Sequence, residues 1–249
     1  MNSRERVRKA LNHIKPDKIP LDLGATGVTG ISASSLTLLR KALNIYKGPV
    51  KVDEPYQVLG EVEMDLIEKI GVDTIGVGLP VTMFGFVNEN WKPWKLTDGT
   101  DVLVSEHFNT ETDKEGNLYI YPGGDKSAKP SAKMPKGGFY FDTLIRQEEI
   151  DPDNLKPEDW VKDMYKVYTD EELRYLENKA NDLYKNTNLS LMGNIGSAGF
   201  GDIAHVPGPG VKNPKGIRDP EEWYVAHLLY PEYIKGIFEL QAEIAIKNY

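Results

Sequence analysis

The stretch LSLMGNIGSAGFGDIAHVPGP, residues 189–209, carries the strongest sign of the fold in this chain. Its apolar start, residues 189–192, predicts a buried strand. Four glycines follow at short intervals: Gly193, Gly196, Gly199 and Gly201. Glycine lets the backbone approach a ligand closely, so a strand that ends in such a turn is a candidate ligand site. The alternative is a tight turn in which the glycines only relieve steric clashes.

Spacing and composition exclude several kinds of site. The glycines do not follow the dinucleotide-binding pattern, and no Gly-Lys-Ser or Gly-Lys-Thr sequence of a P-loop follows them. The chain has no cysteine, so its own residues form no disulfide, thiolate metal site or cysteine nucleophile. The net charge is −8 and there is no basic stripe, so we expect no nucleic-acid partner.

The start of the sequence, MNSRERVRKALNHIKP, is charged and lacks the apolar segment of a signal peptide. No run approaches the roughly 20 apolar residues that a membrane span requires. We therefore expect a cytoplasmic protein with no membrane partner.

Helix and strand signals alternate along much of the chain, as in α/β proteins with a parallel sheet. Three strands are predicted: 19–23, 73–77 and 189–192. Apolar spacing and capping residues predict helices over 3–12, 33–43, 55–70 and 170–184, and two further helices that begin at Pro220 and Pro231. Residues 151–159 are predicted to be a turn-rich linker.

Residues 84–145 break this alternation. Asp98-Gly99 and Glu115-Gly116-Asn117 predict hairpin turns between short strands, so we expect one antiparallel insertion. We expect its aromatic side chains to form a small satellite core. The whole chain, 1–249, is then a single domain with a β-rich insertion.

A complete (β/α)₈ barrel takes about 250 residues, but only three parallel strands are found in this length. Either the chain is a small open α/β fold, or it is the N-terminal part of a longer TIM barrel. The last predicted helix is still running at Tyr249, which favours the truncated barrel.

Several motifs resemble the uroporphyrinogen decarboxylase superfamily, and more narrowly its branch of corrinoid-dependent methyltransferases. They are the opening MNSRERV, ALNH at 10–13, PDKIPLDLG at 16–24, Asn194-Ile195-Gly196-Ser197 and Pro231-Glu232-Tyr233. The resemblance implies a TIM barrel with its site at the C-terminal ends of the strands. It implies a methyl donor that is a corrinoid protein or free cobalamin, and a small thiol or methylated substrate.

The two chemistries of that superfamily differ in what they require. The resemblance implies that decarboxylases hold tetrapyrrole carboxylates with an arginine-rich loop after the first strand. Here residues 24–30 contain no arginine, and the nearest, Arg40, lies inside the next predicted helix. The methyltransferases are implied to hold zinc with a histidine and two cysteines. This chain has no cysteine, so we expect zinc only from a missing C-terminal part.

The candidate site residues lie after the first and third predicted strands. Asp22, Asn194 and His205 are the catalytic candidates. The candidates for binding substrate or corrinoid are Gly24, Thr26, Ser197, Gly199, Phe200 and Asp202. Each has a structural alternative, such as an Asx turn for Asn194, a helix cap for Asp202 and core packing for Phe200. No metal ligands are predicted, because His13, His107 and His227 have no partners at metal-binding spacing.

The leading hypothesis is thus the N-terminal portion of a uroporphyrinogen decarboxylase-like methyltransferase that moves a methyl group between a corrinoid and a thiol. Two alternatives stay open. One is a uroporphyrinogen decarboxylase, and the other is a non-catalytic module that binds a corrinoid or tetrapyrrole.

Overall fold

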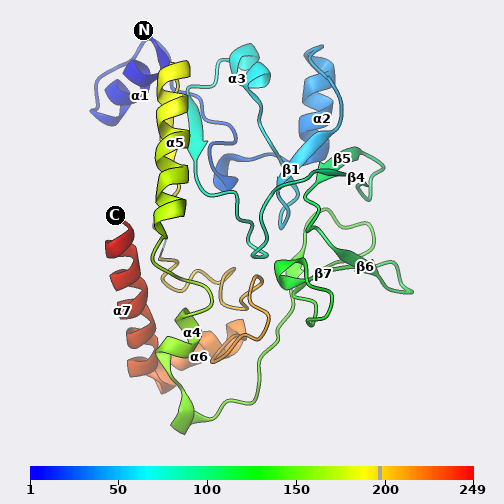
Figure 1. The fold of residues 1–249 in the computed structure, drawn as a ribbon, viewed down its shortest axis with the longest axis vertical. Coiled ribbons are helices and arrows are strands. Elements are labelled where there is room, and N and C mark those ends of the chain that lie inside the picture. Colours follow the sequence, from blue (N-terminus) through cyan, green and yellow to red (C-terminus); the bar gives the residue numbers. More distant parts are fainter. Residues whose placement is uncertain (196–197) are drawn as a thin grey trace. The chain divides into compact units, whose positions relative to one another are not determined.

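A computed structural model describes residues 1–195 and 198–249 (Figure 1). The chain divides into two compact units, each assembled from separate segments. Unit 1 comprises Met1–Pro80, Trp91–Val104 and Tyr168–Ile195, and unit 2 comprises Val81–Asn90, Ser105–Val167 and Gly196–Tyr249. The predicted insertion at 84–145 is therefore shared between the two units.

A parallel pair of strands forms the centre of unit 1. β3 (Thr74–Val77) pairs with β10 (Ser190–Gly193) in parallel register, with Thr74 opposite Ser190. The helix α5 (Asp170–Asn186) contacts both strands. These elements confirm the predicted strands 73–77 and 189–192 and the predicted helix between them.

The prediction of a strand over 19–23 is wrong, because this segment does not form the series of backbone hydrogen bonds that defines a strand. Asp73 N donates to Leu21 O (2.7 Å), but no further backbone bond follows and no ladder forms. Pro20 has no N–H to donate, and Gly24, with φ 76°, turns the chain away. The segment still runs alongside β3 in the same direction, because the next side chain, Asp22, reaches Thr74.

Three short helices cover unit 1. α1 (Ser3–Leu11) begins at a capping box formed by Asn2 and Glu5, and α2 (Ala33–Ala42) is capped by Ser32. α3 (Met64–Ile70) ends at Gly71, whose left-handed backbone (φ 74°) stops the helix. A 3₁₀ turn, η1 (Gly27–Thr29), lies before α2.

The prediction of one helix over 55–70 is wrong in its first half. Residues 50–60 instead form an antiparallel hairpin of β1 (Val50–Glu54) and β2 (Leu59–Gly60). The Glu54 carboxylate accepts hydrogen bonds from Tyr56 N (2.8 Å) and Gln57 N (2.7 Å), which fixes the turn. Val50 and Val52 are buried on one face, at strand rather than helix spacing.

The first predicted hairpin belongs to this sheet. β4 (Lys92–Lys95) and β5 (Asp101–Val104) are antiparallel, as predicted around Asp98-Gly99. β5 also pairs in parallel with β1, so the four strands lie in the order β2-β1-β5-β4. The expectation of a purely antiparallel insertion is therefore wrong at this contact.

Unit 2 contains a second, fully antiparallel sheet in the order β6-β7-β8-β9. Its strands are β6 (Thr110–Thr112), β7 (Leu118–Ile120), β8 (Ala132–Met134) and β9 (Asp142–Thr143), with a 3₁₀ turn, η2 (Pro122–Gly124), after β7. Phe84 and Phe108 both pack edge-on against the buried ring of Phe141. These contacts confirm the predicted satellite core, although Phe139 and Tyr140 remain exposed.

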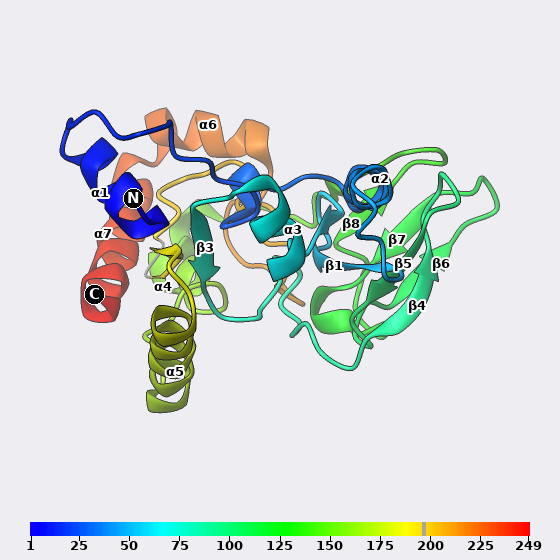
Figure 2. The ribbon, with the colours of Figure 1, turned by 90° about the horizontal axis from the view of Figure 1, so that it is seen from above.

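The rest of unit 2 is helical and surrounds two stacked indoles. Trp160 and Trp223 lie with ring centroids 5.2 Å apart, and both are buried. They belong to α4 (Pro157–Val161) and α6 (Pro220–Leu229), and α7 (Pro231–Asn248) packs against both helices (Figure 2). The predicted linker 151–159 thus contains the 3₁₀ turn η3 (Pro152–Asn154) and the start of a helix.

The described residues form a mixed α/β structure in which no closed barrel is present. Among the helices of this part of the chain, none combines the length and the apolar character that crossing a membrane requires.

Candidate functional site

The C-terminal end of the β3–β10 pair is the first place where predicted site residues gather. Asn194 N donates to Val77 O (2.8 Å) and so extends the parallel ladder by one bond. β10 ends in Gly193, and Gly78 follows the last residue of β3. A Cβ added at Gly193 would meet only the Ile195 side chain among the described residues, at 3.8 Å. Lys179 Nζ, from α5, donates to Gly78 O (3.3 Å). Among the described residues, a Cβ at Gly193 therefore has space, the Asn194 side chain is exposed, and the Lys179 ammonium is bound to the carbonyl that follows β3.

Asp22 does not join this site. Its Oδ1 accepts a hydrogen bond from Thr74 Oγ1 at 2.6 Å, and Thr74 is the first residue of β3. Thr74 is level with Ser190, four residues before Asn194, which corresponds to about 13 Å along a strand. The structure therefore places Asp22 and Asn194 at opposite ends of the pair.

Gly24 and Thr26 lie in a loop that closes on itself. Gly24 N donates to Thr29 O (3.0 Å), and Thr29 N donates to Thr26 O (3.2 Å). The side chain of Glu54 lies beneath this loop, because a Cβ at Gly27 would sit 3.9 Å from Glu54 Cγ. Burial raises the pKa of the Glu54 carboxyl, although hydrogen bonds from Gln57 N and Tyr56 N oppose the shift.

The remaining candidates follow in the glycine turn of unit 2, and Ser197 lies outside the described residues. Successive backbone turns join three of the others: Asp202 N donates to Gly199 O (2.9 Å), and His205 N donates to Asp202 O (3.0 Å). Asp202 Oδ1 accepts from Ala204 N (3.0 Å). No helix begins here, so the prediction of a helix cap at Asp202 is wrong, and the residue forms an Asx turn instead.

Two glycines of this turn have a steric role. A Cβ at Gly199 would lie 2.2 Å from the hydroxyl of Tyr165, and one at Gly201 would lie 3.2 Å from the ring of Phe238. Both glycines also have left-handed backbones, with φ of 75° and 78°. Burial raises the pKa of the Tyr165 phenol to about 12. At Gly199 and Gly201, glycine is therefore needed because a larger residue would clash with Tyr165 or Phe238, and not because a ligand contacts the backbone there.

Phe200, predicted to line a pocket, lies on an open apolar groove of about 540 Å³. Its ring is 54% exposed and meets Phe238 edge-on, with centroids 6.1 Å apart. The other lining residues come from α6 and α7 and the junction between them: His227, Pro231, Ile234, Lys235, Glu239 and Ala242. His227 Nδ1 lies 2.8 Å from Trp223 O, and because a carbonyl oxygen only accepts, Nδ1–H is the donor in this contact.

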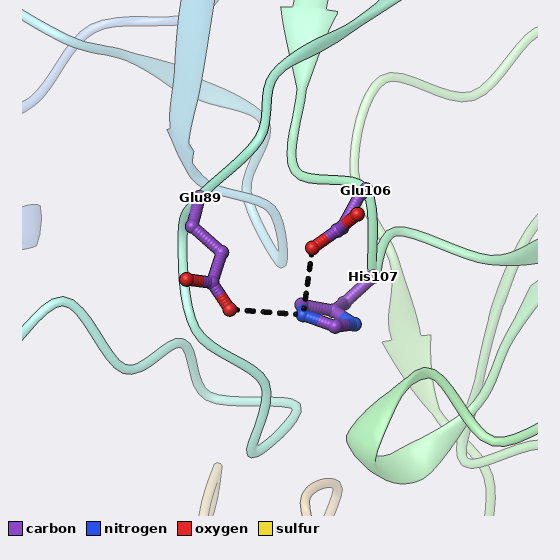
Figure 3. A group of neighbouring side chains, drawn as sticks. All are labelled: Glu89, Glu106 and His107. Atoms are coloured by element: carbon purple, nitrogen blue, oxygen red, sulfur yellow. Dashed lines mark hydrogen bonds and ion pairs between the residues drawn. The ribbon is translucent and has the colours of Figure 1, made fainter.

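A further cluster was missed by sequence reasoning. Glu89, Glu106 and His107 lie side by side in unit 2 (Figure 3). The sequence shows no partner for His107 at metal-binding spacing, but the fold brings two glutamates beside it. Glu89 precedes β4 and the other two follow β5, so the hairpin between them brings the three together. Hairpin pairing, which the sequence did predict, was the signal that could have found this cluster.

Comparison of the chain with protein-family models, curated proteins and solved structures finds no match.

Proposed function

We propose that the chain is part of a corrinoid-dependent methyltransferase of the uroporphyrinogen decarboxylase type. The motifs at residues 1–24, 194–197 and 231–233 support this proposal. So does the arrangement of β3, α5 and β10, in which α5 leads directly into β10, contacts both strands, and β10 pairs in parallel with β3, as a helix and neighbouring strands of a (β/α)₈ barrel do. We therefore also propose that β3 and β10 are two strands of such a barrel. A cytoplasmic location is part of the same proposal.

The strand end at Asn194 is the observation that carries it. Barrel enzymes build their sites at the C-terminal ends of strands; here β10 ends in Gly193, and Gly78 follows the last residue of β3. The Asn194 amide both donates and accepts hydrogen bonds, which suits the amide side groups of a corrin ring. Lys179 beside it adds a cation for a negatively charged group of the acceptor. The residues present thus fit a polar, amide-bearing ligand.

The position of Arg40 favours methyl transfer over decarboxylation. Its guanidinium is buried and makes two hydrogen bonds to Asp65, at 2.9 and 2.8 Å, and an ion pair with Glu63 at 3.2 Å. A cation held by two carboxylates inside the protein does not bind the carboxylates of a tetrapyrrole. With no arginine in residues 24–30, this loop lacks the groups that porphyrinogen binding needs.

The corrinoid, when bound, supplies the methyl group. It would give a methyl cation equivalent to the thiol sulfur and keep the electron pair of its carbon–cobalt bond, while the thiol proton would pass to solvent. A zinc site with two thiolates does not fit this chain, which has no cysteine, so no step is assigned to zinc here. The role we assign to Asn194 and Lys179 is to bind and orient the two substrates.

The test is binding and turnover with methylcobalamin and a small thiol. We expect the chain to bind cobalamin, measured by calorimetry, and the Asn194→Ala variant to bind about tenfold more weakly, as when one hydrogen bond is lost. Asn186→Ala, at the far end of α5, is the matched control and should bind normally. Formation of the methyl thioether is followed by mass spectrometry.

Each outcome decides between the hypotheses. Thioether formation supports methyl transfer. Binding without transfer, with or without added zinc, points to a non-catalytic corrinoid module. Conversion of uroporphyrinogen to coproporphyrinogen, or the absence of any cobalamin binding, overturns the proposal.

A further inference from the structure

Three side chains with metal-binding atoms converge on one point of unit 2. His107 Nε2 lies 3.1 Å from Glu89 Oε1 and 3.5 Å from Glu106 Oε1, and all three donor atoms lie within 4.8 Å of one another (Figure 3). The side chains are 40% to 51% exposed, so solvent reaches the point between them. Figure 3 shows the Glu89 and Glu106 carboxyl groups approaching the same ring nitrogen from two chain segments.

The two distances from His107 Nε2 to the glutamate oxygens match those between ligands that share one metal ion. Zinc binds histidine nitrogen and carboxylate oxygen at about 2.0 to 2.2 Å, so two ligands lie about 3.0 Å apart at right angles and about 3.4 Å apart at the tetrahedral angle. A shared metal ion explains the arrangement of these three side chains better than hydrogen bonds between them do. A neutral imidazole has one N–H at Nε2, and that proton cannot be directed fully at two carboxylates.

The backbone beneath the three side chains is braced before any ligand arrives. Glu106 N donates to Glu89 O (3.2 Å), and Ser105 Oγ joins the two segments by donating to Val87 O (2.7 Å). Asn90 Nδ2 donates to Glu106 Oε1 (2.6 Å) and so orients that carboxylate from outside the cluster. Outer hydrogen bonds of this kind hold metal ligands in place in known sites.

We propose that Glu89, Glu106 and His107 form a binding site for a divalent transition-metal ion of the zinc type. A histidine ligand such as His107 binds zinc, copper and nickel ions more readily than magnesium or calcium ions. Magnesium and calcium prefer sites in which all the ligands are oxygen atoms. Three protein ligands leave one tetrahedral position, which water fills at this exposed site. The site needs no cysteine, and it does not depend on the methyl-transfer proposal, whose candidate residues lie elsewhere.

The test uses the full chain without an affinity tag. Zn²⁺ binding is measured by equilibrium dialysis, and Co²⁺ is used as a second probe because its visible absorption reports a four-coordinate site. We expect one ion per chain. His107→Ala and Glu89→Gln should each weaken binding by about 100-fold or more, since even outer-shell changes cost 10- to 100-fold. Asn90→Gly, which keeps the left-handed backbone at that position (φ 47°), should cost about tenfold.

The matched control is His13→Ala, an exposed histidine of unit 1, which should bind zinc like the parent chain. Far-UV circular dichroism checks that each variant is folded. The proposal is overturned if the parent chain binds no ion, or if folded His107→Ala and Glu89→Gln bind as tightly as the parent.

Discussion

Replacing Asp73 by Asn should destabilise unit 1, because this buried carboxylate holds the β3–β10 pair to two other segments. The carboxylate is 1% exposed and joins three segments. Oδ1 accepts hydrogen bonds from Ser3 Oγ (2.7 Å) and from the Arg6 guanidinium, and Oδ2 accepts from Leu21 N (3.0 Å). Asparagine keeps the shape but removes the charge and turns an NH₂ group toward one of these donors.

The expected loss is about 3 kcal/mol. Removing one partner of a buried ion pair typically costs about 3 to 5 kcal/mol, and the low end applies because Arg6 keeps its bonds to Asp17. For a chain of this length that loss lowers the melting temperature by about 6 to 12 °C. Hydrogen exchange over residues 73–77 and 190–193, measured by mass spectrometry, reports the same change locally.

The pH dependence provides the control. Burial acts to raise the pKa of the Asp73 carboxyl, but the hydrogen bonds from Leu21, Ser3 and Arg6 outweigh it, so the pKa is lowered from 3.8. A depressed pKa stabilises the fold above the unfolded value, and that stability is lost as the pH falls through the folded pKa. The difference between parent and variant should therefore be full at pH 7 and shrink below pH 3.8. Equal stability at pH 7, or a difference that persists in acid, would refute the reasoning.

Three further changes test other parts of the fold by thermal unfolding. Gly76→Ala places a Cβ 2.1 Å from Ala25 O and should cost about 1 to 3 kcal/mol by overpacking. The control Gly193→Ala places its Cβ 3.8 Å from the nearest side chain and should be neutral. Equal effects of the two changes would contradict the close approach of Ala25 O to Gly76. Arg218→Met removes the buried donors to Trp160 O (2.8 Å) and Lys215 O (2.7 Å), which should cost about 3 kcal/mol, and an unchanged melting temperature would show that those carbonyls find other partners. Thr169→Ala removes the cap that accepts from Glu172 N (3.2 Å) and should cost about 1 kcal/mol, whereas Thr169→Ser keeps the capping hydroxyl and should be neutral.

Local signals in the sequence predicted the helices well. Thr169 with Glu172, Asp219 with Pro220, and Pro231 each mark a helix start, and each is where the structure begins α5, α6 and α7. A cap acts within one turn of chain, so its chemistry can be read from adjacent residues.

The errors came from contacts between distant residues. Residues 19–23 have the composition of a strand. In the structure, however, the segment forms a single backbone hydrogen bond with its neighbour, from Asp73 N to Leu21 O, and this contact between distant residues cannot be read from the local sequence. Residues 55–63 have apolar spacing that suits a helix, but the pairing of Val52 with Gly60 makes them a hairpin. The metal-ligand cluster was missed for the same reason, since His107 meets Glu89 only after β4 and β5 have paired.

The interleaving of the two units has a consequence for synthesis on the ribosome. Unit 1 is completed by residues 168–195, and β3 pairs only with β10 among the described strands. The guanidinium of Arg4 meets its partner Leu189 O across 185 positions of sequence. An emerging chain must therefore hold α1, α3 and β3 without their final partners until residue 189 has been made. Contacts of such long range slow folding, so a nascent chain halted before residue 189 is the species most in need of a chaperone.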